Sequence, residues 1–300
     1  MTSLKIDSAA SDVPSSLKEK TGVALNAQRF KMLEDIAAEL AGDVVFPTCF
    51  DVVVRLRQAL QDPNQSIGDI AAIINLEPLL VSKLLLLANS VTYNRGSKHI
   101  YDVASACNRV GLTMVRKAAI AISMKQLMRL QNSREFEDMK RQLWEHSVYT
   151  ASAAYVIARR VGSLNADQAM LAGLVHDLGA FYMIYRATEY EELRIRPDTV
   201  KYLVFEWHES IGHSLLGALG LPEEIVEACY EHEQIQELTT KPRNLRDVVA
   251  VANVVAARLL GKFAPVPDTT RMESFEIPEQ YLELKDEIQT RATEMMDVFS

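Results

Sequence analysis

The sequence predicts an all-α protein with two helical lobes and no substantial β-sheet. Apolar residues recur three or four positions apart through most of the chain, as they do on the buried face of a helix. The alternation of apolar and polar residues that is typical of a half-buried strand is absent. Of the 300 residues, 48% are hydrophobic, which is enough to build a substantial core.

Residues 1–42 are expected to form a loose arm and a peripheral helix. Residues 1–25 are rich in Ser, Lys and Asp, and such a composition gains little free energy from burial. Asn26 is a suitable N-cap, and apolar side chains follow it at helical spacing as far as Gly42. These apolar side chains are Phe30, Leu33, Ile36, Ala37 and Leu40.

Residues 43–132 are expected to form the first helical lobe. Helix-breaking residues divide this part of the chain into short segments, and they are Pro47, Asp62-Pro63, Pro78 and Gly111. Between them, apolar residues return every three or four positions, as at Val52, Val53, Leu56 and Leu60, or at Leu80, Leu84 and Leu87. Each segment is therefore predicted to be a helix that buries one face.

The polar stretch at residues 131–138 is the predicted boundary between the lobes. Residues 138–262 form the second predicted lobe, with five longer helices at 138–160, 165–185, 200–219, 222–234 and 244–261. Residues 263–300 are expected to form a linker around Ala264 to Asp268 and a charged terminal helix from about Pro278 to Phe299.

Composition excludes several classes of protein. The formal net charge is -8, from 32 basic and 40 acidic residues, which argues against a protein whose main partner is nucleic acid or an anionic membrane. No apolar run is long enough to span a bilayer, and the N-terminus lacks the pattern of a secretory signal. Cys49, Cys107 and Cys229 are widely spaced and form no CxxC, so a reducing, cytoplasmic environment fits best.

The best indication of function is His176-Asp177, an adjacent imidazole and carboxylate in the apolar run from Leu171 to Gly179. Burying an unpaired charge costs several kcal/mol, so a carboxylate in apolar sequence usually faces a cation, a set of donors or a metal. His and Asp are common ligands of Zn, Fe, Mn and Ni. The alternative is a helix end at which Asp177 caps or forms an ion pair and His176 is simply hydrogen-bonded.

The other histidines differ in what they suggest. His146 lies in a helical stretch and, taken alone, is more typical of a hydrogen-bonded core histidine. His208 and His213 are five residues apart, about 140° around a helix, so both are not expected to reach one ion. His232 is placed toward the end of its helix, where the dipole favours an imidazolium. His99 is in a polar turn and is expected to be solvated.

The sequence contains no glycine-rich phosphate loop, no GxSxG and no HExxH. It therefore gives no support for a nucleotide-binding loop, a serine hydrolase or a zincin metalloprotease. The remaining candidate is a cluster in which His146, His176 and Asp177 converge on one divalent ion, with His208 and His232 nearby. Such a site would suit metal-assisted hydrolysis of a phosphoester.

His146, followed thirty residues later by His176-Asp177 on an all-helical background, resembles the HD superfamily. Its phosphohydrolases carry a His, His-Asp, Asp ligand set, and the last Asp is expected as Ala-Asp in a late helix. At the matching place this chain has Ala252-Asn253. Asn253 can coordinate through its amide oxygen but brings no negative charge, so the affinity for a divalent cation should fall.

The first lobe is similar to the HDOD family, a signalling branch of the HD fold. The resemblance covers about residues 43–260. Its most specific part is the run from Lys83 to Tyr93, which contains Asn89-Ser90. Further matches are Val45-Phe46-Pro47, Asp62-Pro63 with Ser66-Ile67, Glu77-Pro78-Leu79, Val110-Gly111, Leu143-Trp144 and Leu221-Pro222-Glu223. On chemistry alone, Asn89 and Ser90 are expected to bond backbone groups at a helix end.

The resemblance implies a two-lobed, HDOD/HD-like helical bundle and leaves three functions open. The first is a bacterial signal-transduction protein with a degenerate metal site, which uses its paired helical halves as a platform for binding a signalling partner. The second is a metal-dependent phosphohydrolase, with Asp177, His208 and His232 as candidate catalytic groups. The third is binding of a phosphorylated small molecule such as a cyclic dinucleotide without turnover. The implied metal ligands are His146, His176, Asp177, Asn253, His208 and His232, and the metal would be Fe, Mn, Zn, Ni or Mg.

Overall fold

The computed structural model describes residues 15–41, 48–94, 98–129, 134–230, 232–233, 237–261 and 276–299. Every regular element in these ranges is a helix or a helical turn, which confirms the all-α prediction. None of the helices in the described part of the chain combines the length and the apolar character needed to cross a bilayer. The Val45-Phe46-Pro47 motif, residues 131–133 and the linker from Ala264 to Asp268 lie outside the described residues.

The first lobe consists of short helices whose ends follow local sequence signals. They are α2 (Asp51–Gln61), α3 (Ile67–Ile74), α4 (Pro78–Asn89), α5 (Val103–Val110) and α6 (Leu112–Arg129). Ser66 caps α3 by accepting a hydrogen bond from the backbone N–H of Asp69, whose carboxylate accepts one from the backbone N–H of Ser66. Pro78 occupies the first turn of α4, and Gly111 separates α5 from α6 at a φ of 84°.

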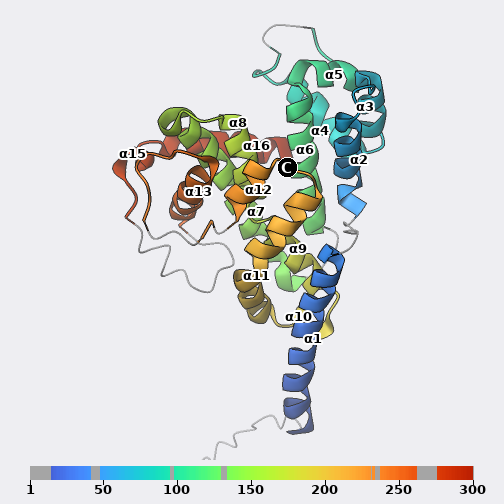
Figure 1. The fold of residues 1–300 in the computed structure, drawn as a ribbon, viewed down its shortest axis with the longest axis vertical. Coiled ribbons are helices and arrows are strands. Elements are labelled where there is room, and N and C mark those ends of the chain that lie inside the picture. The colour runs from blue at the N-terminus through green and yellow to red at the C-terminus, as the bar shows by residue number, and fades with distance from the viewer. Residues whose placement is uncertain are drawn as a thin grey trace, which may run out of the picture.

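The second lobe is built around a long central helix, α7 (Glu137–Ile157), which continues into a π-helical turn at Ala158–Gly162. The other helices of this lobe are α8 (Ala166–Val175), α9 (Leu178–Ala187), α10 (Glu191–Arg194), α11 (Pro197–Ala218), α12 (Glu223–Cys229) and α13 (Leu245–Leu260). Helices α8 and α13 pack against α7, and α11 packs against α9 (Figure 1).

Three of the predicted helices in the C-terminal part of the chain have different bounds. The helix predicted at 165–185 is two helices, α8 and α9, because the chain bends at His176-Asp177. The helix predicted at 222–234 ends at Cys229, so His232 lies beyond it. The terminal helix predicted at 278–299 is divided into α15 (Glu279–Leu282) and α16 (Lys285–Phe299).

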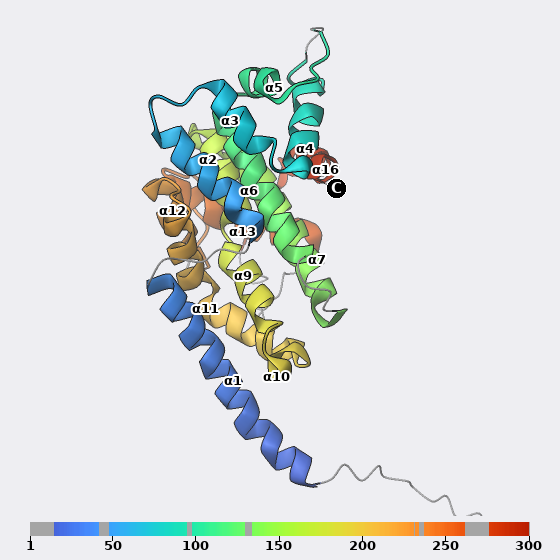
Figure 2. The same ribbon diagram turned by 90° about the vertical axis from the view of Figure 1, so that its right-hand side faces the viewer.

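The N-terminal helix begins earlier than predicted. Helix α1 (Ser15–Ala41) contains Asn26 in its interior, so Asn26 is not an N-cap and the expected loose arm is helical from Ser15. Ordinary helix formers such as Leu and Lys precede Asn26, and they extend the helix past the residue that could have capped it. The first half of α1 projects away from the body (Figure 2).

Two helices flank the body at its ends. The C-terminal part of α1 packs on α10, and it is anchored by the Tyr182 hydroxyl, which donates to Glu39 at 2.6 Å, and by the Tyr190 hydroxyl, which donates to Asp35 at 2.7 Å. Helix α16 packs against α7 of the second lobe and against α4 and α6 of the first. It therefore spans the junction between the lobes.

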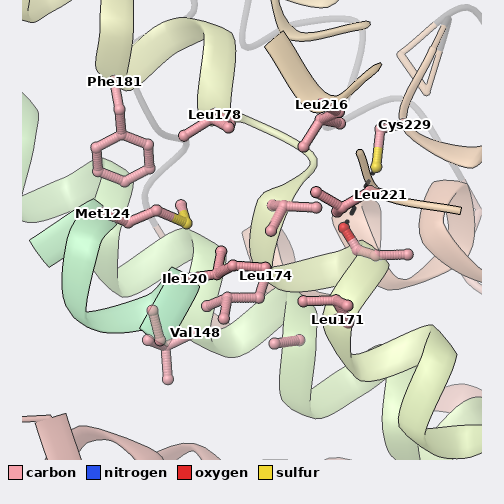
Figure 3. Packing of buried hydrophobic residues seen from close by; sticks show 14 of the residues in the cluster. Ile120, Met124, Val148, Leu171, Leu174, Leu178, Phe181, Leu216, Leu221 and Cys229 are labelled. Carbon is pink, nitrogen blue, oxygen red and sulfur yellow. Dashed lines mark hydrogen bonds between the residues drawn. The ribbon is translucent and has the colours of Figure 1, made fainter. Parts of the chain in front are cut away.

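One continuous core joins the two lobes. Helix α6 of the first lobe contributes Ile120 and Met124 to the same cluster of buried side chains as Leu174 of α8 and Phe181 of α9 (Figure 3). Two arginines of the first lobe also bind the end of α11, where Arg57 donates to the main-chain oxygen of Ala218 and Arg116 to that of Gly220. A cation at this position stabilises the partial negative charge at the C-terminus of a helix.

Helices α9 and α11 touch through their backbones. A Cβ atom built on Gly179 would lie 2.0 Å from the main-chain oxygen of His208 and 2.6 Å from the main-chain nitrogen of Gly212. No side chain fits in that gap. Gly179 therefore allows the first turn of α9, which follows Asp177 directly, to approach the helix that carries His208.

We expect Gly179→Ala to lower the free energy of unfolding by about 3 kcal/mol, because the two helices must separate to admit one methyl group. Urea unfolding followed by circular dichroism measures this loss. The matched control is Gly217→Ala in α11, where a Cβ would meet nothing within 4 Å. It should change stability by no more than about 1 kcal/mol, in the stabilising direction, because Ala favours a helix. Equal stabilities of the two variants would contradict the close approach.

Candidate metal centre

Six buried polar side chains meet in the interior of the second lobe, and we call them the histidine–aspartate cluster. They come from α7, from the junction of α8 and α9, from α11, from the turn after α12 and from α13. None is more than 6% exposed. The members are His146, His176, Asp177, His208, His232 and Asn253. The structure thus brings together every residue that the sequence suggested as a ligand.

Asp177 lies at the centre of the cluster, and its two carboxylate oxygens face different histidines. Its Oδ2 is 3.2 Å from Nε2 of His176 and 4.0 Å from Nε2 of His146. Its Oδ1 is 3.5 Å from Nε2 of His208 and 3.4 Å from Nε2 of His232. Two groups of metal-ligating atoms therefore share one carboxylate: a first triad of His146, His176 and Asp177, and a second triad of Asp177, His208 and His232.

Backbone carbonyls orient three of the imidazoles. The Nδ1 atoms of His176, His208 and His232 lie 2.8 Å, 2.8 Å and 2.9 Å from the main-chain oxygens of Gly173, Val204 and Cys229 respectively. A carbonyl can only accept a hydrogen bond, so each Nδ1 carries the proton. The buried Nε2 atoms are then aimed at Asp177. In the neutral ring Nε2 bears a lone pair, and a lone pair facing a carboxylate oxygen is stable only with a proton or a cation between them.

The ionisation of the cluster is uneven. Burial opposes the charge on Asp177, but His176 and the hydrogen bonds from His176 and His232 hold the pKa of Asp177 well below its ordinary value. Burial also opposes the charge on His232, and there Asp177 overcomes it and raises the pKa to about 9. At His146, burial and the nearby His176 lower the pKa to about 4. A positive charge is therefore favoured on the imidazole of His232 and disfavoured on that of His146.

Asn253 of α13 contacts His146 directly, with 2.7 Å between Oδ1 of the amide and Nε2 of the ring. In this orientation the ring nitrogen donates its proton to the amide oxygen. If the amide were rotated by 180°, its nitrogen would instead donate to the lone pair of Nε2. In both orientations the contact with Asn253 occupies the ring nitrogen that faces Asp177.

Two glutamates next to the cluster were not identified from the sequence. Oε1 of Glu233 lies 3.9 Å from Nε2 of His208, and Oε1 of Glu209 lies 3.4 Å from Nδ1 of His232. Glu209 also accepts a hydrogen bond of 3.0 Å from the backbone N–H of Glu233. The available signal was that each glutamate directly follows a candidate histidine, His208 or His232. That signal is weak until α11 and the turn after α12 are known to lie together.

The remaining residues that the sequence singled out lie outside the cluster. His213 is half-buried and pairs with Glu227 at 3.2 Å, because its position on α11 points away from His208. His99 is exposed, and its ring stacks on Tyr101. Asn89 bonds the backbone of Ile100, accepting from its N–H and donating to its oxygen, each at 2.8 Å. Asn89 therefore has the structural role that its chemistry suggested.

A divalent cation fits the donor set of the cluster. Imidazole nitrogens suit Fe, Ni and Zn, and a carboxylate adds the negative charge that a buried cation needs. The backbone carbonyls that fix the three Nδ1 protons are the outer partners that metal-binding histidines usually have. The cluster also requires α7 and α8 to pack closely, and Gly173 of α8 allows this. A Cβ at this position would lie 2.8 Å from the main-chain oxygen of Thr150 in α7.

The chain matches a family model and several known proteins. The model of the HDOD domain matches residues 46–235. An uncharacterized protein from Treponema pallidum (strain Nichols) is 25% identical over 254 residues, which cover 80% of this chain and 47% of that protein. The chain therefore spans about half the length of this curated relative.

Two solved structures share the fold. One, from Shewanella amazonensis SB2B, carries the name of a candidate metal-dependent phosphohydrolase, with a TM-score of 0.60, 21% identity, and coverage of 89% of this chain and 99% of that one. The other, an HDOD domain protein with unknown function from Geobacter sulfurreducens, has a TM-score of 0.55, 21% identity, and coverage of 91% and 99%. At these identities the likeness establishes the fold alone.

We expect Asn253→Asp to increase cation binding at the first triad by about tenfold, because it places a second carboxylate beside His146. Isothermal titration with a divalent ion measures the change. Asn253→Ala, which also removes the contact with His146 but adds no charge, is the matched control. If Asn253→Asp showed no gain over this control, the charge at position 253 would not contribute to the triad.

Proposed function

The chain belongs to the HDOD domain family, and on this premise we propose that it is a bacterial regulatory protein that binds a divalent cation in the histidine–aspartate cluster. The observation that supports cation binding most directly is the meeting of four imidazoles on the single buried carboxylate of Asp177. Burying a charged group without compensation costs several kcal/mol, so such a carboxylate requires a positive partner. A bound cation would link the junction of α8 and α9 to other elements of the second lobe through their side chains.

The regulatory role is supported by two features of the cluster. Asn253 supplies no charge where the phosphohydrolases of the resembled superfamily carry a carboxylate. The cluster is also deeply buried, since none of its six residues is more than 6% exposed, and a cavity of about 410 Å³ beside α8, α12 and the start of α13 is lined by none of them. A phosphoester would need an open path to the metal ligands. The partner of the regulator is, in this proposal, a signalling protein or a phosphorylated small molecule such as a cyclic dinucleotide.

A metal-dependent phosphohydrolase is the second candidate. It is favoured by the intact first triad and by the two groups of ligand atoms that share Asp177. A bound divalent cation would supply a coordinated water of lowered pKa and would neutralise phosphate oxygens. Glu233, whose pKa is raised by burial, would be the nearest carboxyl group able to hold a proton beside His208.

Cation binding is tested on the full chain after removal of metal with a chelator. We expect Mn²⁺, Fe²⁺ or Zn²⁺ to raise the unfolding temperature of the wild type, because the ion binds only the folded form. Asp177→Asn removes the shared carboxylate and should lower the affinity by about a hundredfold or more. His213→Ala, a histidine outside the cluster, is the control. A wild type that binds none of these ions would exclude the proposal.

The hydrolase alternative is tested on the same metal-loaded protein with bis-p-nitrophenyl phosphate and cyclic dinucleotides. A regulatory protein should release no p-nitrophenol above the rate of the Asp177→Asn variant. Turnover by the wild type that Asp177→Asn abolishes would instead establish the phosphohydrolase.

A further inference from the structure

We propose that the two sides of Asp177 are unequal and that the chain holds a single cation in the second triad, with Glu233 as an additional carboxylate ligand and Glu209 as a positioning residue. This inference rests on cation binding by the cluster, as proposed above. It goes further by stating which side is used and by adding two residues to the site.

The first triad is short of both charge and free donor atoms. Its only carboxylate is Asp177, which it shares with the other side. The neighbouring side chain from α13 is the neutral amide of Asn253, and its 2.7 Å contact occupies Nε2 of His146 in either amide orientation. A cation on this side would have to break that contact before it could bind His146, and its only charged ligand would be one oxygen of Asp177.

The second triad has both donor atoms available. Nε2 of His208 and Nε2 of His232 face Oδ1 of Asp177 at 3.5 Å and 3.4 Å. Backbone carbonyls accept from both Nδ1 atoms, so the Nε2 atoms are the ones that can bind a cation, and at His232 the cation would take the place of the Nε2 proton that Asp177 holds in the metal-free chain. Both residues are at most 2% exposed, so water contributes little to the solvation of their side chains.

Among the described residues, two further carboxylates flank this side. Oε1 of Glu233 is 3.9 Å from Nε2 of His208, which places negative charge close to a cation bound by that nitrogen. Glu209 lies behind the site: its Oε1 is 3.4 Å from Nδ1 of His232, and it accepts the backbone N–H of Glu233 at 3.0 Å. Glu209 therefore holds the His232-Glu233 turn against α11 and orients both ligands without touching the cation.

Negative charge is therefore distributed unevenly between the two sides of Asp177. One side faces the neutral amide of Asn253, and the opposite side has Glu209 and Glu233. Each negative ligand offsets part of the cost of burying a divalent cation. The second triad with Glu233 supplies two carboxylates, and the first triad supplies one.

The test is a titration of the full chain, stripped of metal, with Mn²⁺. We expect one ion per chain in the wild type. His208→Ala should weaken binding by about a hundredfold, and Glu233→Gln, which keeps the shape and removes the charge, by about tenfold. His146→Ala makes the same truncation on the other side of Asp177 and should change the affinity by less than about threefold. Asn253→Asp should raise the stoichiometry from one ion to two.

Spectroscopy separates a ligand from a residue that only supports the fold. Co²⁺ replaces Mn²⁺ in the same proteins, and its visible absorption reports the atoms bound to it. Glu233→Gln should change this spectrum, whereas Glu209→Gln should weaken binding a few-fold and leave the spectrum unchanged. Glu227→Gln, which affects only the exposed pair with His213, is the matched control. Circular dichroism of the metal-free variants verifies that each one is folded.

The outcomes distinguish this inference from the proposed function. If the wild type binds no divalent ion, cation binding by the cluster fails, and this inference fails with it. If the wild type binds an ion but His146→Ala abolishes binding, or if Glu233→Gln alters neither affinity nor spectrum, only the choice of side and of ligand is overturned. Two ions per chain in the wild type would also overturn it, while cation binding would stand.

Discussion

The burial of one carboxylate is the constraint on which the second lobe depends. Asp177 lies at the bend between α8 and α9, and four imidazoles from separate elements surround it. Those elements must come close together, and Gly173 and Gly179 allow it by bringing α8 against α7 and α9 against α11 through their backbones. The electrostatic requirement of one side chain thus determines where five parts of the chain meet.

The surroundings of Asp177 differ on its two sides. On one side the amide of Asn253 binds His146, and on the other Glu209 and Glu233 lie next to His232 and His208. In the resembled superfamily the charge at position 253 belongs to the ligand set, so its absence alone would suggest a lost site. On the proposal above, the flanking glutamates make the second triad the side of Asp177 that binds a cation.

The two flanking helices contact the elements that carry the cluster. Helix α1 is anchored through Glu39, which pairs with Tyr182 and Arg186 of α9, the helix that follows Asp177. Helix α16 packs on α7, the helix that carries His146, and also on α4 and α6 of the first lobe. Both helices lie outside residues 46–235, the part that matches the family. They connect the surroundings of the cluster to parts of the chain outside the matched domain.

The sequence by itself determined the helical class, most helix ends in the first lobe and the set of histidines worth considering. Ser66, Pro78 and Gly111 act through their own backbone or through residues a few positions away. Their effect on where a helix begins or ends can therefore be predicted from the neighbouring sequence. Helical geometry likewise separated His208 from His213.

Only the tertiary structure decided the bend at His176-Asp177, the place of His232 beyond α12 and the presence of Glu209 and Glu233 beside the cluster. These features arise from contacts between residues distant in the chain, such as Gly179 with the backbone of α11 and Glu209 with the turn at Glu233. Periodicity describes which face of a helix is buried and contains no information about which charged group lies opposite it.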